Sequence, residues 1–281
     1  MAPLIVITGP TASGKTGLAL NLAEKYGGEI ICADSRTIYR GMDIGTAKPT
    51  VDEQAKVPHH LLGIVEPGER YTARDFQRDA NTAITEIRSR GKVPFLVGGT
   101  GLYIDAVTLD FEWPEQTKDE MYDEKDIDEL QELIKMQHID LPENPQNKRH
   151  LISTLKRAGQ RGTSRDKPAD GTVVVSIATD RRILSERIRA RAEVMFRTGV
   201  VDETIRLAER YGWDSEAMKS NIYPIVRRVI DGELTEHQAI DLFVAKDMGL
   251  AKRQVTWLKR HEYVQWLSLD EAGPYIETVL A

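Results

Sequence analysis

Short apolar runs alternate with longer amphipathic stretches along the first hundred residues. The apolar runs cover residues 4–8, 29–33 and 93–97, and each is followed by small or polar residues, which is typical of buried strands. Helical periodicity lies between them, over residues 15–26 and from the capping signal at Thr72 to about residue 90. This repeated order predicts a parallel α/β sheet whose loops gather at the carboxyl edge of the strands.

The pattern changes between residues 111 and 168, where charged helical segments are broken by Pro142 and Pro145. Strand character returns at residues 172–178, and we expect this run to form a last core strand of the sheet. Helical periodicity then continues over four segments, residues 180–196, 201–211, 222–231 and 235–260.

A glycine-rich phosphate-binding motif, G-x-x-x-x-G-K-T, directly follows the first apolar run. In such a P-loop the glycines let backbone N–H groups surround an oligophosphate, and the following helix adds positive potential. Lys15 would reach the terminal phosphates, and the hydroxyl of Thr16 would ligate Mg²⁺. The residues expected to hold the phosphates are Gly9, Pro10, Thr11, Ala12, Ser13, Gly14, Lys15 and Thr16.

These features predict an α/β fold class: a P-loop NTPase-like parallel sheet with flanking helices and a small all-helical insertion. Residues 1–110 and 169–281 would form the core, and residues 111–168 the insertion. No apolar run approaches about 18 residues, so no membrane span is expected. The first strand begins too early to leave room for a secretory signal, and Cys32 is the only cysteine, so we expect a cytoplasmic protein with a buried, unreactive thiol.

Charge is unevenly distributed along the chain. The formal net charge of −6 argues against a general nucleic-acid coat. Residues 112–132 hold ten acidic and two basic side chains, whereas residues 148–167 are mainly basic. A specific RNA can dock on one basic face of an acidic protein, although both runs could equally be solvated helix faces.

The P-loop alone does not name a reaction, because kinases, ATPases and GTPases share it. Many motor and switch NTPases place an Mg²⁺-holding aspartate after an apolar strand, but here residues 93–97 end in Gly-Gly-Thr. Asp34, at the end of the second strand, is the only carboxylate that the topology places next to the P-loop. It could act as a base or beside Mg²⁺, or simply cap the following turn. Thr100 could likewise only cap a helix.

Several segments in this order closely resemble the bacterial tRNA dimethylallyltransferases, also called tRNA isopentenyltransferases. The similarity is dense over residues 4–105 and clear again over 230–260. Its most specific part is the run Gly-Met-Asp-Ile-Gly-Thr-Ala-Lys-Pro. The segments are residues 9–16, 33–35, 39–49, 58–61, 98–103 and 251–257.

The resemblance implies transfer of a dimethylallyl group from its diphosphate to the exocyclic amine of the adenosine 3′ of the anticodon. It implies dimethylallyl diphosphate as donor, Mg²⁺ as cofactor, and a tRNA anticodon stem-loop as partner; a monomer is the default expectation. Lys15 would neutralise the leaving diphosphate, Thr100 would bind the bridging oxygen of the donor, and Asp34 would accept a proton from the amine. These three residues are the expected catalytic group.

By the same resemblance, one set of residues would contact the tRNA and its target base, and the insertion would bind the tRNA. The set comprises Asp34, Ser35, Arg36, Thr37, Thr100, Arg149, Lys252 and Arg253.

Three features depart from the family pattern. Pro224 and Met248 stand at positions that are usually basic in the family. Arg227, Arg228 and Lys246 are nearby cations that could substitute for them. The insertion is also short, and the sequence does not identify which tRNAs would be read.

Other functions remain open from the residues. A related prenyltransferase acting on free adenine nucleotide would share the P-loop, Asp34 and Thr100 but would need no basic RNA face. A P-loop small-molecule kinase would need an arginine-rich lid, for which residues 161–167 are candidates. A non-catalytic RNA-binding module would need no complete P-loop. The basic stretch and the Ala-Lys-Pro and Lys-Arg-Gln motifs favour tRNA.

Overall fold

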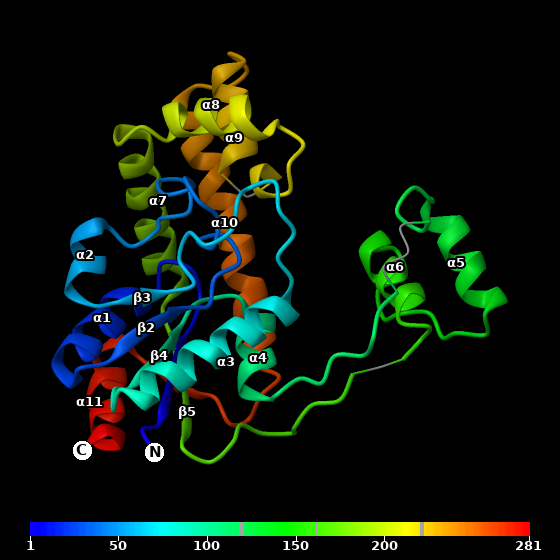
Figure 1. Ribbon diagram of the computed structural model, residues 1–281. Coiled ribbons are helices and arrows are strands. Elements are labelled where there is room, and N and C mark those ends of the chain that lie inside the picture. Colours follow the sequence, from blue (N-terminus) through cyan, green and yellow to red (C-terminus); the bar gives the residue numbers. More distant parts are fainter. Residues whose placement is uncertain (118–120, 161, 220–221) are drawn as a thin grey trace. The chain divides into compact units, whose positions relative to one another are not determined.

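The computed structural model describes residues 1–117, 121–160, 162–219 and 222–281 (Figure 1). The chain divides into two compact units, one made of Met1–Thr108 and Lys167–Ala281 and the other of Leu109–Asp166. Some residues of the segments discussed above lie outside the described residues. They are Arg161 in the basic run, residues 118–120 in the acidic run, and residues 220–221 before the expected helix at 222.

The described residues of the first unit form a six-stranded sheet in which every pairing is parallel. The strand order is β3-β2-β4-β1-β5-β6, so β4 lies between β1 and β2. The loops that follow these three strands therefore meet at one edge, and the predicted fold class is confirmed. The strands are β1 (Leu4–Thr8), β2 (Glu29–Cys32), β3 (His59–His60), β4 (Pro94–Val97), β5 (Thr172–Ile177) and β6 (Gln265–Leu267).

Helices cover both faces of this sheet (Figure 1). Ile5 and Ile7 of β1 pack in one hydrophobic cluster, while Leu4 and Val6 pack in another. A parallel strand with two apolar faces needs a helical layer on each side, which explains its continuous hydrophobic run. The first cluster is completed by α1 (Lys15–Tyr26) and α11 (Leu269–Leu280), and the second by α3 (Ala73–Ser89) and α4 (Gly101–Thr108).

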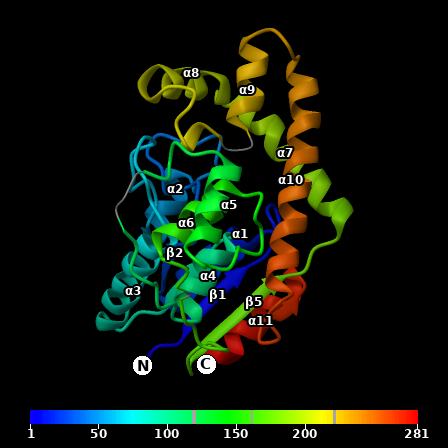
Figure 2. The same cartoon turned by 90° about the vertical axis from the view of Figure 1, so that its right-hand side faces the viewer.

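A second group of helices stands next to the carboxyl edge of the sheet. Figure 2 shows the long helix α10 running beside α7. Their shared cluster also takes in Ile38 and Met42 from the loop after β2, so this group supports that loop. The helices are α7 (Arg181–Arg197), α8 (Val200–Tyr211), α9 (Tyr223–Ile230) and α10 (Glu236–Leu258).

The predicted helix starts are confirmed by their hydrogen bonds. Thr72 and Asp75 form a capping box at α3, and Thr235 forms one with Gln238 at α10. Gly27 ends α1 with φ of 63°, a conformation that glycine adopts without strain. Cys32 is buried as predicted, and burial raises the pKa of its thiol to about 12, so it stays protonated and unreactive.

The second unit contains α5 (Ile127–Met136) and α6 (Lys148–Lys156), which pack against each other. Leu130 and Leu151 are among the buried residues of its own small core. The unit is not entirely helical, because an antiparallel bridge pairs Glu112 with Thr163. Lys156 of the basic stretch is largely buried and pairs with Asp123, so it is no surface cation.

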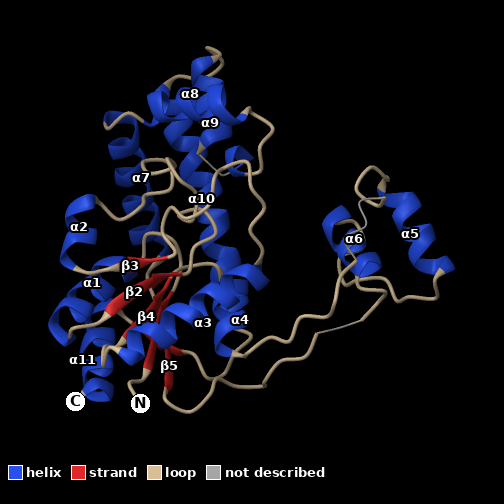
Figure 3. Ribbon diagram, viewed as in Figure 1, coloured by secondary structure: helices blue, strands red, loops and turns tan. Residues whose placement is uncertain are grey.

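Some elements were missed in the sequence. Beyond the strand at residues 172–177, the short strand β6 lies at the edge of the sheet. β6 has three residues, too few to show a periodicity, and Pro274 inside α11 argued against a helix there. The turn-rich stretch between residues 41 and 67 has few regular signals in the sequence, and it contains the short helix α2 (Val51–Lys56) and the two-residue strand β3. Figure 3 shows how short the strands are beside the helices.

None of the helices described here is both long enough and apolar enough to cross a membrane.

Candidate functional site

A cavity of about 490 Å³ opens where β1, β2 and β4 end. Its lining combines the three loops after these strands with side chains from α7 and α10. Among the residues singled out in the sequence, those that line it are Thr11, Lys15, Thr16, Asp34, Ser35, Arg36, Thr37, Thr100 and Arg253.

Other predicted residues do not line this cavity. Lys252 is exposed one residue away from Arg253, and Arg149 is an exposed residue of α6 in the second unit. The remaining residues of the P-loop motif, which lie in the same loop but outside the lining, are Gly9, Pro10, Ala12, Ser13 and Gly14.

The P-loop has the shape that a phosphate site requires. Gly9 and Gly14 adopt φ angles of 139° and 93°, which side chains other than glycine rarely allow. No side chain of the described residues caps α1, so its first N–H groups face the loop without a side-chain acceptor. The buried hydroxyl of Ser13 also has no hydrogen-bond partner within the described chain. These unpaired donors fit an oligophosphate.

Lys15 is the P-loop lysine at the start of α1. Its Nζ lies 3.2 Å from the carbonyl oxygen of Pro10. Burial lowers the pKa of Lys15 from 10.5 to about 8, partly offset by the negative charge of Asp34. Lys15 is therefore still mainly protonated at neutral pH. The negative charge of a bound diphosphate would compensate for the lost solvation of its ammonium group.

The loops that carry Asp34 and Thr100 are joined directly. Thr100 N–H donates to the carbonyl of Ala33 at 3.2 Å, and Ser35 N–H donates to Thr100 Oγ1 at 3.0 Å. A Cβ at Gly98 would lie 2.0 Å from the Ala33 oxygen, so only glycine permits this approach. The hydroxyl of Thr100, which the sequence also allowed as a cap of α4, thus contacts the Asp34 loop. Asp34 does accept the turn hydrogen bond considered in the sequence, and it also lines the cavity.

The sequence suggests that Asp34 is the only carboxylate near the P-loop, but the structure places a second one there. Asp247 of α10 lines the same cavity and accepts from Arg191 of α7 at 2.5 Å. The same guanidinium donates to the hydroxyl of Thr11 at 2.9 Å. Arg191 and Asp247 lie on helices whose apolar faces were recognisable, but no motif indicated that these polar side chains meet the P-loop.

The nearby cations proposed as substitutes do not line the cavity. Arg227 and Arg228 pair with Asp231 and Glu233 on the surface, and Lys246 is also absent from the lining. Pro224 stands in the first turn of α9 and Met248 packs against the helical cluster. The arginines that do line the cavity are Arg36, Arg191 and Arg253.

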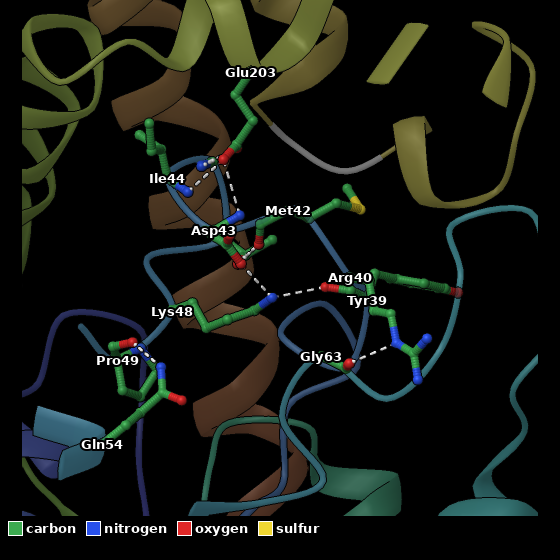
Figure 4. A network of polar contacts seen from close by, with 12 residues as sticks. Tyr39, Arg40, Met42, Asp43, Ile44, Lys48, Pro49, Gln54, Gly63 and Glu203 are labelled. Atoms are coloured by element: carbon green, nitrogen blue, oxygen red, sulfur yellow. Dashed lines mark hydrogen bonds and ion pairs between the residues drawn. The ribbon is translucent and has the colours of Figure 1, made fainter. Parts of the chain in front are cut away.

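One wall of the cavity is the loop after β2, which includes Gly45, Thr46 and Ala47. Figure 4 shows how Glu203 of α8 reaches this loop. The Glu203 carboxylate is 2% exposed and accepts three consecutive backbone N–H groups, from Asp43, Ile44 and Gly45, at 2.8–2.9 Å. Burial keeps the pKa of Tyr223 raised, so its phenol donates a fourth hydrogen bond to Glu203.

Lys48, from the Ala-Lys-Pro motif, faces inward. Its side chain is 6% exposed, and Nζ donates to the Tyr39 carbonyl at 2.7 Å and to Asp43 at 2.5 Å (Figure 4). The sequence favours tRNA binding partly on this motif. In the structure, however, Lys48 stabilises its own loop and does not present a surface charge to RNA.

We expect Glu203→Gln to lower the free energy of unfolding by about 2–3 kcal/mol, because an amide turns an N–H group toward backbone donors that now share a carboxylate. Urea unfolding would measure it. Glu209→Gln, an exposed change on the same helix, is the control. Equal stability of the two variants would show that the loop does not depend on this carboxylate.

The rest of the cavity lining is largely apolar. It includes Met195, Phe243, Leu250 and Trp257. Trp257 lines the cavity, and its indole N–H donates to buried Asp105 at 2.7 Å. The cavity therefore offers hydrogen-bond donors and cations for a phosphate group, two carboxylates, and an apolar surface suited to a hydrocarbon group.

Three comparisons relate this geometry to known proteins. The family described as IPP transferase matches residues 37–261. The tRNA dimethylallyltransferase of Desulforudis audaxviator is 38% identical over 294 residues, covering 96% of this chain and 93% of that protein. The crystal structure of the full-length tRNA isopentenylpyrophosphate transferase from Bacillus halodurans has a TM-score of 0.75 at 34% identity, covering 100% of this chain and 97% of its own.

A eukaryotic dimethylallyltransferase, solved in crystallographic snapshots acting on tRNA, has a TM-score of 0.79 at 22% identity. It covers 96% of this chain and 75% of that one, and the likeness lies in the fold.

Proposed function

The chain belongs to the IPP transferase family, and from this premise we propose that it is a prenyltransferase that modifies tRNA. It would transfer a dimethylallyl group from dimethylallyl diphosphate to the exocyclic amine of the adenosine 3′ of the anticodon. The observation that carries the proposal is a single cavity lined by P-loop residues, Asp34 and Thr100 together with an apolar surface.

The P-loop would hold the diphosphate as a leaving group. Negative charge grows on the diphosphate as the allylic carbon–oxygen bond breaks, and Lys15 with the uncapped N–H groups of α1 would stabilise it. Thr100 Oγ1 accepts from Ser35 N–H and donates over a long 3.4 Å to Ser35 Oγ. With the donor bound, the hydroxyl hydrogen would turn from Ser35 to the bridging oxygen. The apolar lining would receive the prenyl chain.

Mg²⁺ fits this site through the hydroxyl of Thr16, a residue of the P-loop that lines the cavity. Magnesium in P-loop sites takes its ligands mainly from phosphate oxygens and water, with one protein hydroxyl, so no cluster of carboxylates is needed. When bound, the ion would add positive charge at the leaving diphosphate.

Asp34 would accept the proton that the adenine amine loses as its bond to carbon forms. An aromatic amine is a weak nucleophile, and a base helps most once the new bond makes the nitrogen acidic. The target base must leave its stack to reach Asp34, and residues 34–37 would contact it there. We further propose that the protein works as a monomer, since one chain supplies every group named here. We also propose that it works in the cytoplasm.

The second unit is proposed to bind the anticodon arm. Charge reversal by Arg149→Glu should raise the KM for tRNA. A plot of log KM against log salt concentration should also become less steep, by about the amount that one phosphate contact contributes. Arg182→Glu is the control, because that exposed side chain lies in the first unit, where it pairs with Glu186. An unchanged salt slope would remove Arg149 from the RNA-binding surface.

Transfer of radiolabel from dimethylallyl diphosphate tests the function. The acceptors are an unmodified tRNA anticodon stem-loop with adenosine 3′ of the anticodon, the same stem-loop with guanosine there, and AMP. Label in the adenosine stem-loop alone supports the proposal. Label in AMP would identify a nucleotide prenyltransferase, and phosphate transfer from ATP without prenyl transfer would identify a kinase.

A further inference from the structure

Gln254 of α10 lies between the two loops that would hold the reacting groups. Its Oε1 accepts a hydrogen bond from the backbone N–H of Thr11 in the P-loop at 2.8 Å. Its Nε2 donates to the carbonyl of Gly99, next to Thr100, at 2.9 Å. One side-chain amide therefore connects the loops after β1 and β4.

The fit around this amide is tight. A Cβ at Gly99 would lie 2.3 Å from Gln254 Nε2, so the glycine makes room for the side chain. The two contacts need a donor and an acceptor on one planar group of this length. Glutamine satisfies both, glutamate at neutral pH lacks the donor, and methionine lacks both while filling the same volume.

Resting on the function proposed above, we propose that Gln254 is a positioning residue that sets the distance between the leaving diphosphate and the accepting amine. It connects the P-loop backbone to the loop of Thr100, which is itself joined to the Asp34 loop. Gln254 bonds backbone atoms of both loops, so it acts through their placement. Group transfer depends steeply on such placement, and an error of about 1 Å can cost about 100-fold in rate.

We expect Gln254→Met to lower kcat by about 10–100-fold, with the KM of either substrate changed less than about threefold. The cause is a wider range of distances between the two loops in the bound complex. Melting temperatures are measured alongside, so that a loss of folded protein is not mistaken for a loss of rate.

Gln254→Glu supplies a second and more specific readout. At low pH the introduced carboxyl group is protonated, and its O–H can replace the lost donor to the Gly99 carbonyl. At high pH its charge would face that carbonyl oxygen. We therefore expect kcat of this variant, divided by kcat of the parent protein, to fall as pH rises.

Taking this ratio removes the titration that both proteins share. The charged and titratable side chains that line the cavity around Gln254 are Lys15, Cys32, Asp34, Arg36, His59, Arg191, Asp247 and Arg253. For Gln254→Met the ratio should be low and independent of pH, because no titratable group is introduced.

Gln77→Met and Gln77→Glu are matched controls, since Gln77 is a buried glutamine on α3 outside the cavity lining. The inference is overturned if the variants at 254 retain the kcat of these controls, if only KM changes, or if the ratio for Gln254→Glu is independent of pH. A parent protein that transfers no prenyl group would instead overturn the proposed function, so the two failures are distinguishable. If Gln254→Met does not fold, Gln254→Glu at low pH still decides.

Discussion

Asp34→Asn is expected to lower kcat for prenyl transfer about 10³-fold while the Kd for dimethylallyl diphosphate stays within about threefold. Asparagine has the same shape and keeps the oxygen that accepts from Arg36 N–H at 2.8 Å, so the turn should persist. What is lost is the group that can take the proton of the amine. Because we propose that the P-loop holds the donor, its binding should be nearly independent of this change.

Single-turnover transfer to the stem-loop and donor binding by calorimetry would separate the two effects. Asp180→Asn is a matched control, because Asp180 accepts the equivalent turn hydrogen bond, from Arg182 N–H at 2.7 Å, away from the cavity. A loss in Asp34→Asn below about tenfold would exclude Asp34 as the base. A parallel loss of donor affinity would assign it to binding the diphosphate and its metal.

The loops that bring Lys15, Asp34 and Thr100 together were predictable because each follows its strand directly in the sequence. Parallel topology then places all three at one edge, and the pairing of β4 with both β1 and β2 determines which loops touch. Neither step needs knowledge of distant contacts. Motif and topology therefore account for the P-loop side of the cavity and for the position of Asp34.

The opposite wall could not be predicted in the same way. Gln254 meets Thr11 across 243 residues, and Arg191 meets it across 180. A helical periodicity indicates which face is apolar, but it does not say which polar residue at the edge of that face will meet which loop. Asp247 shows the consequence, because in the sequence it is one more charge on a long helix. Lys48 shows the converse, since a lysine in a specific motif turned out to be a buried structural contact.

Lys15→Met is expected to lower kcat/KM for dimethylallyl diphosphate about 10²–10³-fold, since it removes the positive charge that the P-loop would offer to the leaving group. Lys25→Met, an exposed change on the same helix, is the control; Lys25 pairs with Glu277 on the surface. Equal donor kinetics in the two variants would mean that the P-loop lysine does not contact the diphosphate.

The pH dependence of donor binding tests the same lysine without mutation. Burial lowers the pKa of Lys15 to about 8, so the free protein carries this charge below pH 8 and loses it as pH rises through that value. A diphosphate binds the protonated form, and its Kd should therefore be flat from about pH 7 to 8 and rise up to about tenfold per pH unit above it. In Lys15→Met the Kd should be high and lack this alkaline rise. A parent protein whose Kd at fixed free Mg²⁺ does not change between pH 7 and 10 would show that the Lys15 ammonium is not what holds the donor.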